Sequence, residues 1–307
     1  MVEAANFIKI NQNNIVIDGI NIQFPYKPYE SQIKYMKKVI ELCNNKSTLK
    51  NYDGFGAFES PTGTGKTLCL LCSLLAWKEQ AKIKGKFNEK IIYATRTHSQ
   101  ISQIIKELKK TNYKPKIAIL YSREFSCINT GLKDKDNINI NRLNIICRNI
   151  RKIYCKYRNE FKEEQDLTIV SQNDIVDIED LCKEGKQKNF CPFYHQIKKA
   201  QKSADLIFMP YNYLINEDII NYLQLNLENN IIIIDEAHNL NNICENVKSF
   251  EISENDFNDI NKELQYLLNE RNKLNNSLND TLNNSLDDSL IDSIQIEKDG
   301  LLDLNSS

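Results

Sequence analysis

The fold is decided by the stretch Ser60-Pro61-Thr62-Gly63-Thr64-Gly65-Lys66-Thr67. A short apolar run, Gly56–Glu59, precedes this stretch and predicts a strand, whereas Lys66–Gln80 predicts a helix after it. Glycines in such a loop let backbone N–H groups turn inward around phosphate oxygens, and the helix N-terminus favours the same anion. The octapeptide therefore predicts a loop that binds the phosphates of ATP, although Ser60 stands where the general pattern has its first glycine.

Side-chain chemistry in this loop and a second motif complete the predicted nucleotide site. Lys66 can reach the β- and γ-phosphates, and the Thr67 hydroxyl can ligate Mg²⁺. Far along the chain, Ile231–Ile234 predicts a buried strand that ends in Asp235 and Glu236. We expect Asp235 to hold Mg²⁺ and Glu236 to orient and deprotonate the attacking water. His238, which follows, either couples to a further domain or makes a local hydrogen bond.

Apolar runs alternate with helical patterns between these two motifs. Strands are predicted at Gly56–Glu59, Lys90–Thr95, Ile117–Tyr121, Asp205–Met209 and Ile231–Ile234, and helices at Tyr29–Leu42, Lys66–Gln80, Ser99–Lys110 and Asn212–Tyr222. Alternation of this kind predicts an α/β fold with a doubly wound parallel sheet. The stretch 122–203 interrupts the rhythm. Leucines recur at every fourth residue from Leu274 to Leu290, but the Asn, Ser and Asp between them favour disorder or a marginal helix.

Charge and composition limit the class of protein. The net charge of −1 averages the front of the chain, residues 1–250, which has 36 basic and 28 acidic groups, and a tail from residue 251 with 13 acidic and 4 basic residues. A polyanion is therefore expected to bind the front. No apolar run is long enough to span a membrane and no signal peptide is recognisable, so we expect an intracellular protein whose nine cysteines are reduced thiols or metal ligands.

Four cysteines in the interrupting stretch, Cys127, Cys147, Cys155 and Cys191, are separated by 19, 7 and 35 residues. These are not the tight pairs of a zinc ribbon, and the spacing alone leaves a metal site and its absence equally open. Cys182 competes with Cys191 for the fourth place. Cys69 and Cys72 lie in the apolar helix after the phosphate loop and are expected to be core thiols.

Basic residues cluster around the second and third of these cysteines. The stretch 141–159 holds six Lys or Arg, among them Arg148 and Arg151, with interleaved tyrosines and no acidic residue. Phosphate neutralisation together with stacking is how single strands are held without reading their sequence. A plain solvated surface is the alternative. A second candidate contact for the sugar–phosphate backbone follows a predicted strand and consists of Arg96, Thr97, His98, Ser99 and Gln100.

The motifs SPTGTGKT, YATRTHSQ (residues 93–100), MPYNYL (residues 209–214) and DEAHN together resemble those of the XPD-like iron–sulfur helicases of superfamily 2. The resemblance covers roughly residues 15–250. It implies a RecA-like motor domain, a [4Fe–4S] cluster on Cys127, Cys147, Cys155 and Cys191, and an adenine contact from Tyr29 and Gln32. Cys191 is preferred to Cys182 because the Pro-Phe-Tyr that follows it matches the family.

By this resemblance we expect a motor domain over residues 1–121 and 204–250, an iron–sulfur domain inserted at 122–203, and the start of an arch-type insertion with an acidic tail at 251–307. The expected activity is ATP-dependent 5′-to-3′ unwinding of DNA in the nucleus, on single-stranded and forked substrates. Without a second motor domain and its arginine, the 307 residues are expected to hydrolyse ATP barely. A non-catalytic ATP- and DNA-binding module and an RNA-directed, zinc-containing ATPase are the alternatives.

Overall fold

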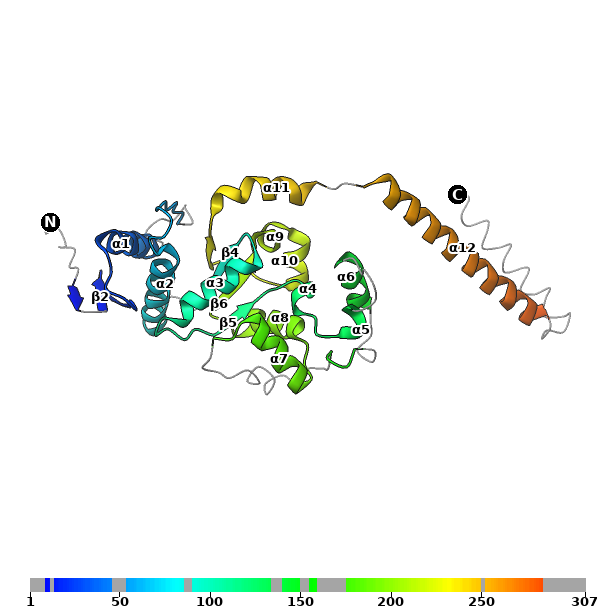
Figure 1. Cartoon of the computed structure of the whole chain (residues 1–307), viewed down its shortest axis with the longest axis horizontal. Helices are drawn as coiled ribbons and strands as arrows, with labels where there is room; N and C mark the ends of the chain where they lie inside the picture. Colours follow the sequence, from blue (N-terminus) through cyan, green and yellow to red (C-terminus); the bar gives the residue numbers. More distant parts are fainter. Residues whose placement is uncertain are drawn as a thin grey trace. The chain divides into compact units, whose positions relative to one another are not determined.

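The computed structural model describes residues 9–11, 14–45, 54–85, 90–133, 140–149, 155–158, 175–249 and 252–283 (Figure 1). They fall into two compact units, which divide between residues 248 and 249. The first unit holds both sheets and the helices α1 to α11, and the second holds the long helix α12 (Glu254–Asn283).

A four-stranded parallel sheet is the centre of the first unit. Its strands are β4 (Ile91–Thr95), β5 (Ile117–Ile119), β6 (Leu206–Pro210) and β7 (Ile231–Ile234), in the order β5-β6-β4-β7. All pairings are parallel, with Tyr93 opposite Phe208 on one side and Ile233 on the other. This arrangement confirms the predicted α/β fold, and it sends the carboxyl ends of all four strands to one edge.

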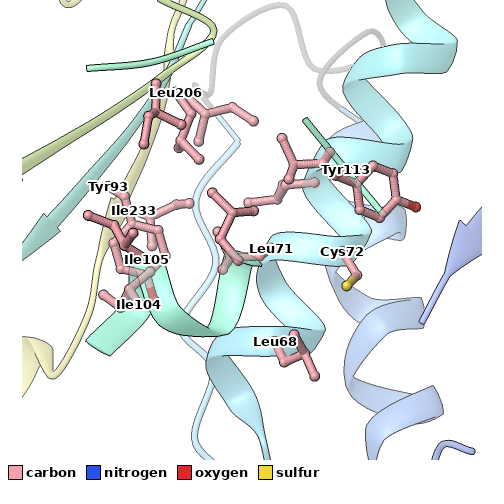
Figure 2. Packing of buried hydrophobic residues seen from close by; sticks show 14 of the residues in the cluster. Leu68, Leu71, Cys72, Tyr93, Ile104, Ile105, Tyr113, Leu206 and Ile233 are labelled. Carbon is pink, nitrogen blue, oxygen red and sulfur yellow. The ribbon is translucent and has the colours of Figure 1, made fainter. Parts of the chain in front are cut away.

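Both faces of this sheet are covered, which is why its strands read as continuous apolar runs. One face, with Tyr93 and Phe208, packs against helices α1 (Glu30–Asn45), α2 (Lys66–Ile83) and α3 (His98–Lys109). Figure 2 shows this layer, in which Leu71 of α2 points toward Tyr93, Ile105 and Ile233, whereas Cys72 lies on the side of α2 toward Tyr113. Cys69 and Cys72 are buried there, and burial raises the pKa of each thiol to about 12, so the prediction of core thiols is confirmed.

The opposite face, with Ile92 and Ile207, packs against the last helix of the stretch 122–203 and against helices that follow this stretch. These are α8 (Pro192–Lys202), α9 (Tyr211–Ile215), α10 (Glu217–Leu223) and α11 (Leu240–Lys248), and a single 3-10 turn, η3 (Ala237–Asn239), leads into α11. The predicted helix over 212–222 is two helices, because the Asn216 side chain accepts the Ile219 N–H and starts a new helix there.

One predicted strand is wrong. Residues 54–60 have no regular secondary structure, and Phe55 is 87% exposed. The segment packs on α1 instead of joining the sheet: Phe58 lies 5.4 Å from the Tyr35 ring, and a Cβ on Gly56 would meet a Leu42 methyl at 2.6 Å. Glycine weakens a strand because it offers no side chain to pack, and here it allows a close approach to a helix.

A three-stranded antiparallel sheet was not predicted. Its strands are β1 (Lys9–Asn11), β2 (Asn14–Ile17) and β3 (Ile20–Gln23), in sequence order. Asp18 and Gly19 form the turn between β2 and β3 with positive φ values of 49° and 78°. An Asp-Gly pair between alternating apolar residues is a strong hairpin signal, so the sequence contained this sheet.

The remaining described elements belong to the cysteine-rich stretch and the tail. The stretch contributes α4 (Arg123–Ser126), α5 (Thr130–Lys133), α6 (Ile140–Asn149) and α7 (Ile178–Lys188). In the second unit, α12 continues through the first leucines of the four-residue repeat, and Leu274 is 62% exposed. The later leucines lie outside the described residues. Strand β7 pairs only with β4 among the described strands, and Ile232 on it is 42% exposed.

Candidate functional site

The phosphate loop runs between the exposed segment 54–60 and α2. Gly63 and Gly65 adopt φ values of 78° and 75°, a left-handed conformation that glycine takes without strain. Gly65 caps α2 with no side-chain hydrogen bond, which leaves the first N–H groups of the helix for a ligand. The Lys66 ammonium donates to the Ser60 carbonyl at 2.8 Å, and the Ser60 and Thr64 hydroxyls lie 2.6 Å apart. The loop is therefore closed on itself and presents backbone donors to an anion.

Gln32 holds this loop against α1. Its Oε1 accepts the Tyr29 N–H at 2.9 Å, and its Nε2 donates to the Thr64 carbonyl at 2.9 Å. A Cβ on Gly65 would approach the same Nε2 to 2.9 Å, so the contact depends on glycine. Gln32 is buried, whereas Tyr29 is 73% exposed. The structure thus gives Gln32 a bracing role, and its predicted contact with adenine stays a prediction, as does that of Tyr29.

The two halves of the predicted nucleotide site meet at Tyr93. Its side chain is fully buried, and its hydroxyl has no hydrogen-bond partner among the described residues although Thr67 of α2 and Asp235 lie close to it. Asp235 directly follows β7, and its N–H donates to the Ala94 carbonyl at 3.0 Å. Burial and the neighbouring Glu236 carboxylate raise the pKa of Asp235, and the nearby Tyr93 hydroxyl opposes this in part. The net pKa of Asp235 is raised, which is typical of a carboxylate that gains from a nearby cation.

The sequence reasoning missed Tyr93, and it considered Tyr211 as a weaker nucleic-acid contact or a helix cap and did not place it beside the acidic residues. The Tyr211 hydroxyl donates to the Asp235 carbonyl and, at 3.1 Å, to the Glu236 carbonyl, so it supports the turn that carries both acidic residues. Each tyrosine stands in or directly after a buried strand of otherwise apolar residues. For Tyr211, which directly follows β6, the position at the carboxyl end of a strand was the available signal.

The loop after β4 divides the predicted nucleic-acid contacts into two groups. Thr97 and Gln100 form a capping box: the Thr97 hydroxyl accepts the Gln100 N–H, and the Gln100 side chain accepts the Thr97 N–H at 3.1 Å. Their side chains therefore start α3. Arg96 and Ser99 are exposed, and Ser99 lies 2.9 Å from the Thr97 hydroxyl. His98 stacks on Tyr121 at 4.7 Å between ring centroids, and burial lowers its pKa.

A groove opens beside this loop at the carboxyl edge of the sheet. It is lined by residues of the β4–α3 loop, the β6–α9 corner and α11: Arg96, His98, Pro210, Asn212, Ile243 and Val247. Arg96 contributes a guanidinium and Asn212 an amide, whereas Ile243 and Val247 contribute aliphatic side chains. This combination suits a phosphate together with the apolar face of a sugar or base.

The structure brings the four predicted cysteines to one pocket. Cys127 follows α4, Cys147 lies on α6, Cys155 lies in the short described segment 155–158, and Cys191 precedes α8. The pocket is lined by these four and by Ile128, Asn129, Leu132, Tyr157, Arg158 and Tyr194. Cys182 does not line it, and its thiol contacts the Phe125 carbonyl at 3.7 Å.

The chemistry of this pocket fits an iron–sulfur cluster. Cysteine thiolates are the ligands of such a cluster, and N–H groups that donate hydrogen bonds to the sulfurs adjust its reduction potential. The Asn129 amide lies 3.6 Å from the Cys155 sulfur in that sense. Burial, together with the neighbouring thiols, raises the pKa of Cys191 to about 12. Among the side chains that the structure describes, no three His, Cys, Asp or Glu converge on one point as ligands of a single ion do. The ligand set stays a prediction.

Basic and aromatic side chains surround the pocket. The Arg148 guanidinium lies 4.8 Å from the Tyr222 ring, and that of Arg158 lies 4.8 Å from the Tyr194 ring. Arg123 is buried over the Phe193 ring at 4.0 Å, so it links α4 to the helices on the motor side. Arg148 is exposed and available to a ligand. Arg151, the other predicted contact, lies outside the described residues.

Comparison with known proteins identifies the family. The DEAD_2 family model matches residues 93–257, which is more than half of the chain and includes both the cysteine-rich stretch and the strand that ends in Asp235. The chain belongs to the DEAD_2 family. This result confirms the resemblance to XPD-like helicases of superfamily 2 that the motifs indicate.

Several relatives of this DEAD_2 chain are named as telomere helicases. It is 35% identical over 281 residues to regulator of telomere elongation helicase 1 of Mus musculus, a match that covers 79% of this chain and 22% of that protein. The homologue from Arabidopsis thaliana is 37% identical over 78% of this chain and 25% of its own length, and that from Caenorhabditis briggsae 39% over 76% and 25%. The chain thus spans about a quarter or less of these relatives.

Two solved structures are also similar to the DEAD_2 chain. One, described as an XPD helicase, has a TM-score of 0.48 and 27% identity, and the match covers 71% of this chain and 34% of that chain. The other, a truncated XPD, has a TM-score of 0.44 at the same identity, and the match covers 68% of this chain and 53% of that chain.

Within the described part of the chain, none of the helices has the length and apolar character needed to cross a membrane.

Proposed function

We propose that this chain is the ATP- and single-strand-binding part of a DNA helicase that uses ATP hydrolysis to unwind duplex DNA in the 5′-to-3′ direction. The observation that carries the proposal is the closeness of Thr67 and Asp235, which both lie near the buried Tyr93 hydroxyl, itself unpaired among the described residues. The two residues come from motifs at opposite ends of the motor sequence, and a hydroxyl and a carboxylate beside a phosphate loop are the partners that Mg-ATP needs.

In this proposal each residue has a defined task. The backbone of residues 60–65 and Lys66 hold the phosphates, Thr67 and Asp235 hold Mg²⁺, and Glu236 orients and deprotonates water. Arg96 and Ser99, with Arg148 and Arg151, contact the sugar–phosphate backbone of single-stranded or forked DNA. The four pocket cysteines would hold a [4Fe–4S] cluster, which ties their chain segments together.

The domain division is part of the proposal. Residues 1–121 and 204–250 would form the motor domain, 122–203 its iron–sulfur insertion, and 251–307 the start of an arch-type insertion. DNA repair, recombination and telomere maintenance in the nucleus are the expected setting, since relatives are named for telomere elongation. Alone, these 307 residues would hydrolyse ATP slowly, because the resemblance assigns the charge-stabilising arginine to a second motor domain.

The test is binding of fluorescent single-stranded DNA, and of RNA with the same sequence, over a series of salt concentrations. We expect sequence-tolerant binding that favours DNA and weakens with salt. Arg148→Glu should flatten the slope of log affinity against log salt by about 0.7 or more, since each lost phosphate contact on a single strand contributes that amount. Lys186→Glu on the exposed surface of α7 is the matched charge reversal and should leave the slope nearly unchanged.

Two results would replace this proposal. Tighter binding of RNA than of DNA, with zinc and no iron in the purified protein, would make the chain part of an RNA-directed ATPase. ATP and DNA binding without any hydrolysis in the presence of its natural partner domains would make it a non-catalytic module.

A further inference from the structure

The turn after β7 holds Glu236 in an unusual conformation. Its φ of 55° lies in the left-handed region, which is costly for a residue with a side chain. Two side chains hold its carbonyl: the Tyr211 hydroxyl at 3.1 Å and the Asn239 amide nitrogen at 3.3 Å. The position of Glu236 therefore depends on residues outside the phosphate loop.

A chain of side-chain contacts runs from the loop after β4 to the Glu236 carboxylate. The Arg96 guanidinium donates to Asn239 Oδ1 at 3.3 Å. Asn239 Nδ2 lies 2.8 Å from His238 Nε2, and His238 Nδ1 lies 3.3 Å from Glu236 Oε2. Arg96 and Glu236 follow neighbouring strands, β4 and β7, so this connection spans the two loops at the carboxyl edge of the sheet.

Hydrogen-bond donors and acceptors are matched at each contact between Arg96 and Glu236. A guanidinium can only donate, so Asn239 receives it through its oxygen and turns its NH₂ group toward the imidazole. His238 Nε2 must then accept, which places the ring proton on Nδ1, where it faces a carboxylate that can only accept. A ring protonated on both nitrogens would set one N–H against another. The arrangement therefore favours the Nδ1–H tautomer of His238.

Among the four residues of this contact series, Arg96 is the one that faces the groove and can contact a nucleic acid. It is exposed and lines the groove with Asn212 and Ile243. A hydrogen bond from a guanidinium to a phosphate is charge-assisted and about twice as strong as one to a neutral amide oxygen. A phosphate in the groove would therefore take Arg96 away from Asn239.

We propose that Asn239 and His238 are positioning residues that connect Arg96 to Glu236, so that a nucleic-acid phosphate bound by Arg96 releases the Glu236 carboxylate from its resting contact. The inference rests on the proposed function, because it takes a single strand as the ligand and Glu236 as the group that orients water. It adds a route by which strand binding reaches the nucleotide site.

The three histidines of the chain make the test possible in the intact protein. In protein labelled with ¹⁵N at histidine, NMR reports which ring nitrogen carries the proton. His195 is buried in the core and reports folding, His98 lines the groove and reports DNA binding, and His238 reports the connection. The probe is a single-stranded oligothymidylate.

We expect wild-type His238 to be in the Nδ1–H form and to change its ring signals when the oligothymidylate is added. In Asn239→Ala, His238 should lose the Nδ1–H preference without DNA and should not respond to it, while His195 stays unchanged and His98 still responds. Asn242→Ala, an exposed asparagine on α11, is the matched control and should behave as wild type.

Each other outcome has a clear meaning. A response of His98 without one of His238 in the wild type, or an Asn239→Ala protein that matches the wild type, overturns the inference and leaves DNA binding intact. Absence of DNA binding, with no response from His98, overturns the inference together with the proposed function.

Discussion

The nucleotide site and the cysteine pocket differ in how the chain encodes them. The nucleotide site depends mainly on backbone conformation over a few consecutive residues, namely two left-handed glycines and the start of α2. Other segments add Gln32, which supports the loop, and the acidic pair after β7. The cysteine pocket takes each thiol from a different segment, and nothing in the local backbone connects them. The first kind of site can be read from a short motif, whereas the second becomes visible only when the chain is folded.

Loss of a pocket cysteine should have the largest effect, because the pocket depends on all four side chains. We expect Cys191→Ser to lose nearly all bound iron and its visible absorption after anaerobic purification, with a lower melting temperature, since metal binding and folding are coupled. Cys182→Ser and Cys72→Ser are the controls, at a nearby and a core thiol, and should keep their iron. Iron retained by Cys191→Ser and lost by Cys182→Ser would mean that the ligand set is wrong.

Removal of the phosphate-loop lysine should have the next largest effect. Lys66→Ala removes one charge-assisted contact, worth about 1.5–3 kcal/mol, so ATP affinity should fall roughly 10- to 100-fold. Isothermal calorimetry with Mg-ATP measures this change. Lys34→Ala, which removes an exposed partner of Glu30 on α1, controls for loss of a lysine. Equal ATP affinities of Lys66→Ala and wild type would remove the loop from the nucleotide site.

Backbone conformation itself is tested by two alanine substitutions at left-handed glycines. Gly65→Ala and Gly19→Ala share a positive φ, so each should lower the free energy of unfolding by about 1–2 kcal/mol. Only the added methyl of Gly65→Ala meets Gln32, at 2.9 Å, whereas Gly19 has open space. Chemical denaturation and ATP titration should therefore show that Gly65→Ala alone also weakens ATP binding. If both variants bind ATP as the wild type does, Gln32 does not brace the loop.

The smallest expected effect concerns His98 of α3, whose ring contacts Tyr121 and also Phe125 of α4. Burial lowers the pKa of His98, so the neutral ring is favoured in the folded chain, and its contribution to stability is lost as pH falls through the ordinary pKa of histidine near 6.5. His98→Phe keeps the stacking and should make the free energy of unfolding less dependent on pH in that range. Urea denaturation at several pH values measures the difference, and an unchanged pH dependence would contradict the assignment.

What the sequence could predict follows the same division. The four parallel strands were predicted because each is a run of apolar residues, although only Ile233 of β7 is buried. Their carboxyl ends locate Asp235 and Arg96. Spacing alone could not choose between Cys182 and Cys191, because the choice depends on which thiol turns toward the pocket after α7 and α8 have packed. The strand predicted at Gly56–Glu59 was wrong for a related reason. A strand has to pair with the edge of another strand, and composition does not show whether such an edge is available.

Competition between local and long-range roles explains the other differences. Thr97 and Gln100 have a local role that the sequence reasoning did not predict, because Thr-x-x-Gln at the start of a helix is a capping box and the structure uses both side chains in that way. Their contact with nucleic acid stays a prediction. The β2–β3 hairpin could have been predicted from its Asp18-Gly19 turn. Tyr93 could not have been assigned to the nucleotide site from the sequence, because its neighbour Thr67 is separated from it by the whole of α2.

Strand β7 has a consequence for handling the protein in solution. Four consecutive isoleucines form a strand that is paired on one side only among the described residues, and Ile232 is partly open to solvent. Residues of this kind have high β-propensity and no charge, which is the signature of a segment that recruits other extended chains. Asp235 at one end is the nearest charged residue to oppose such growth. Samples of this chain should therefore aggregate with rising concentration, and conditions that keep Asp235 ionised should delay the loss.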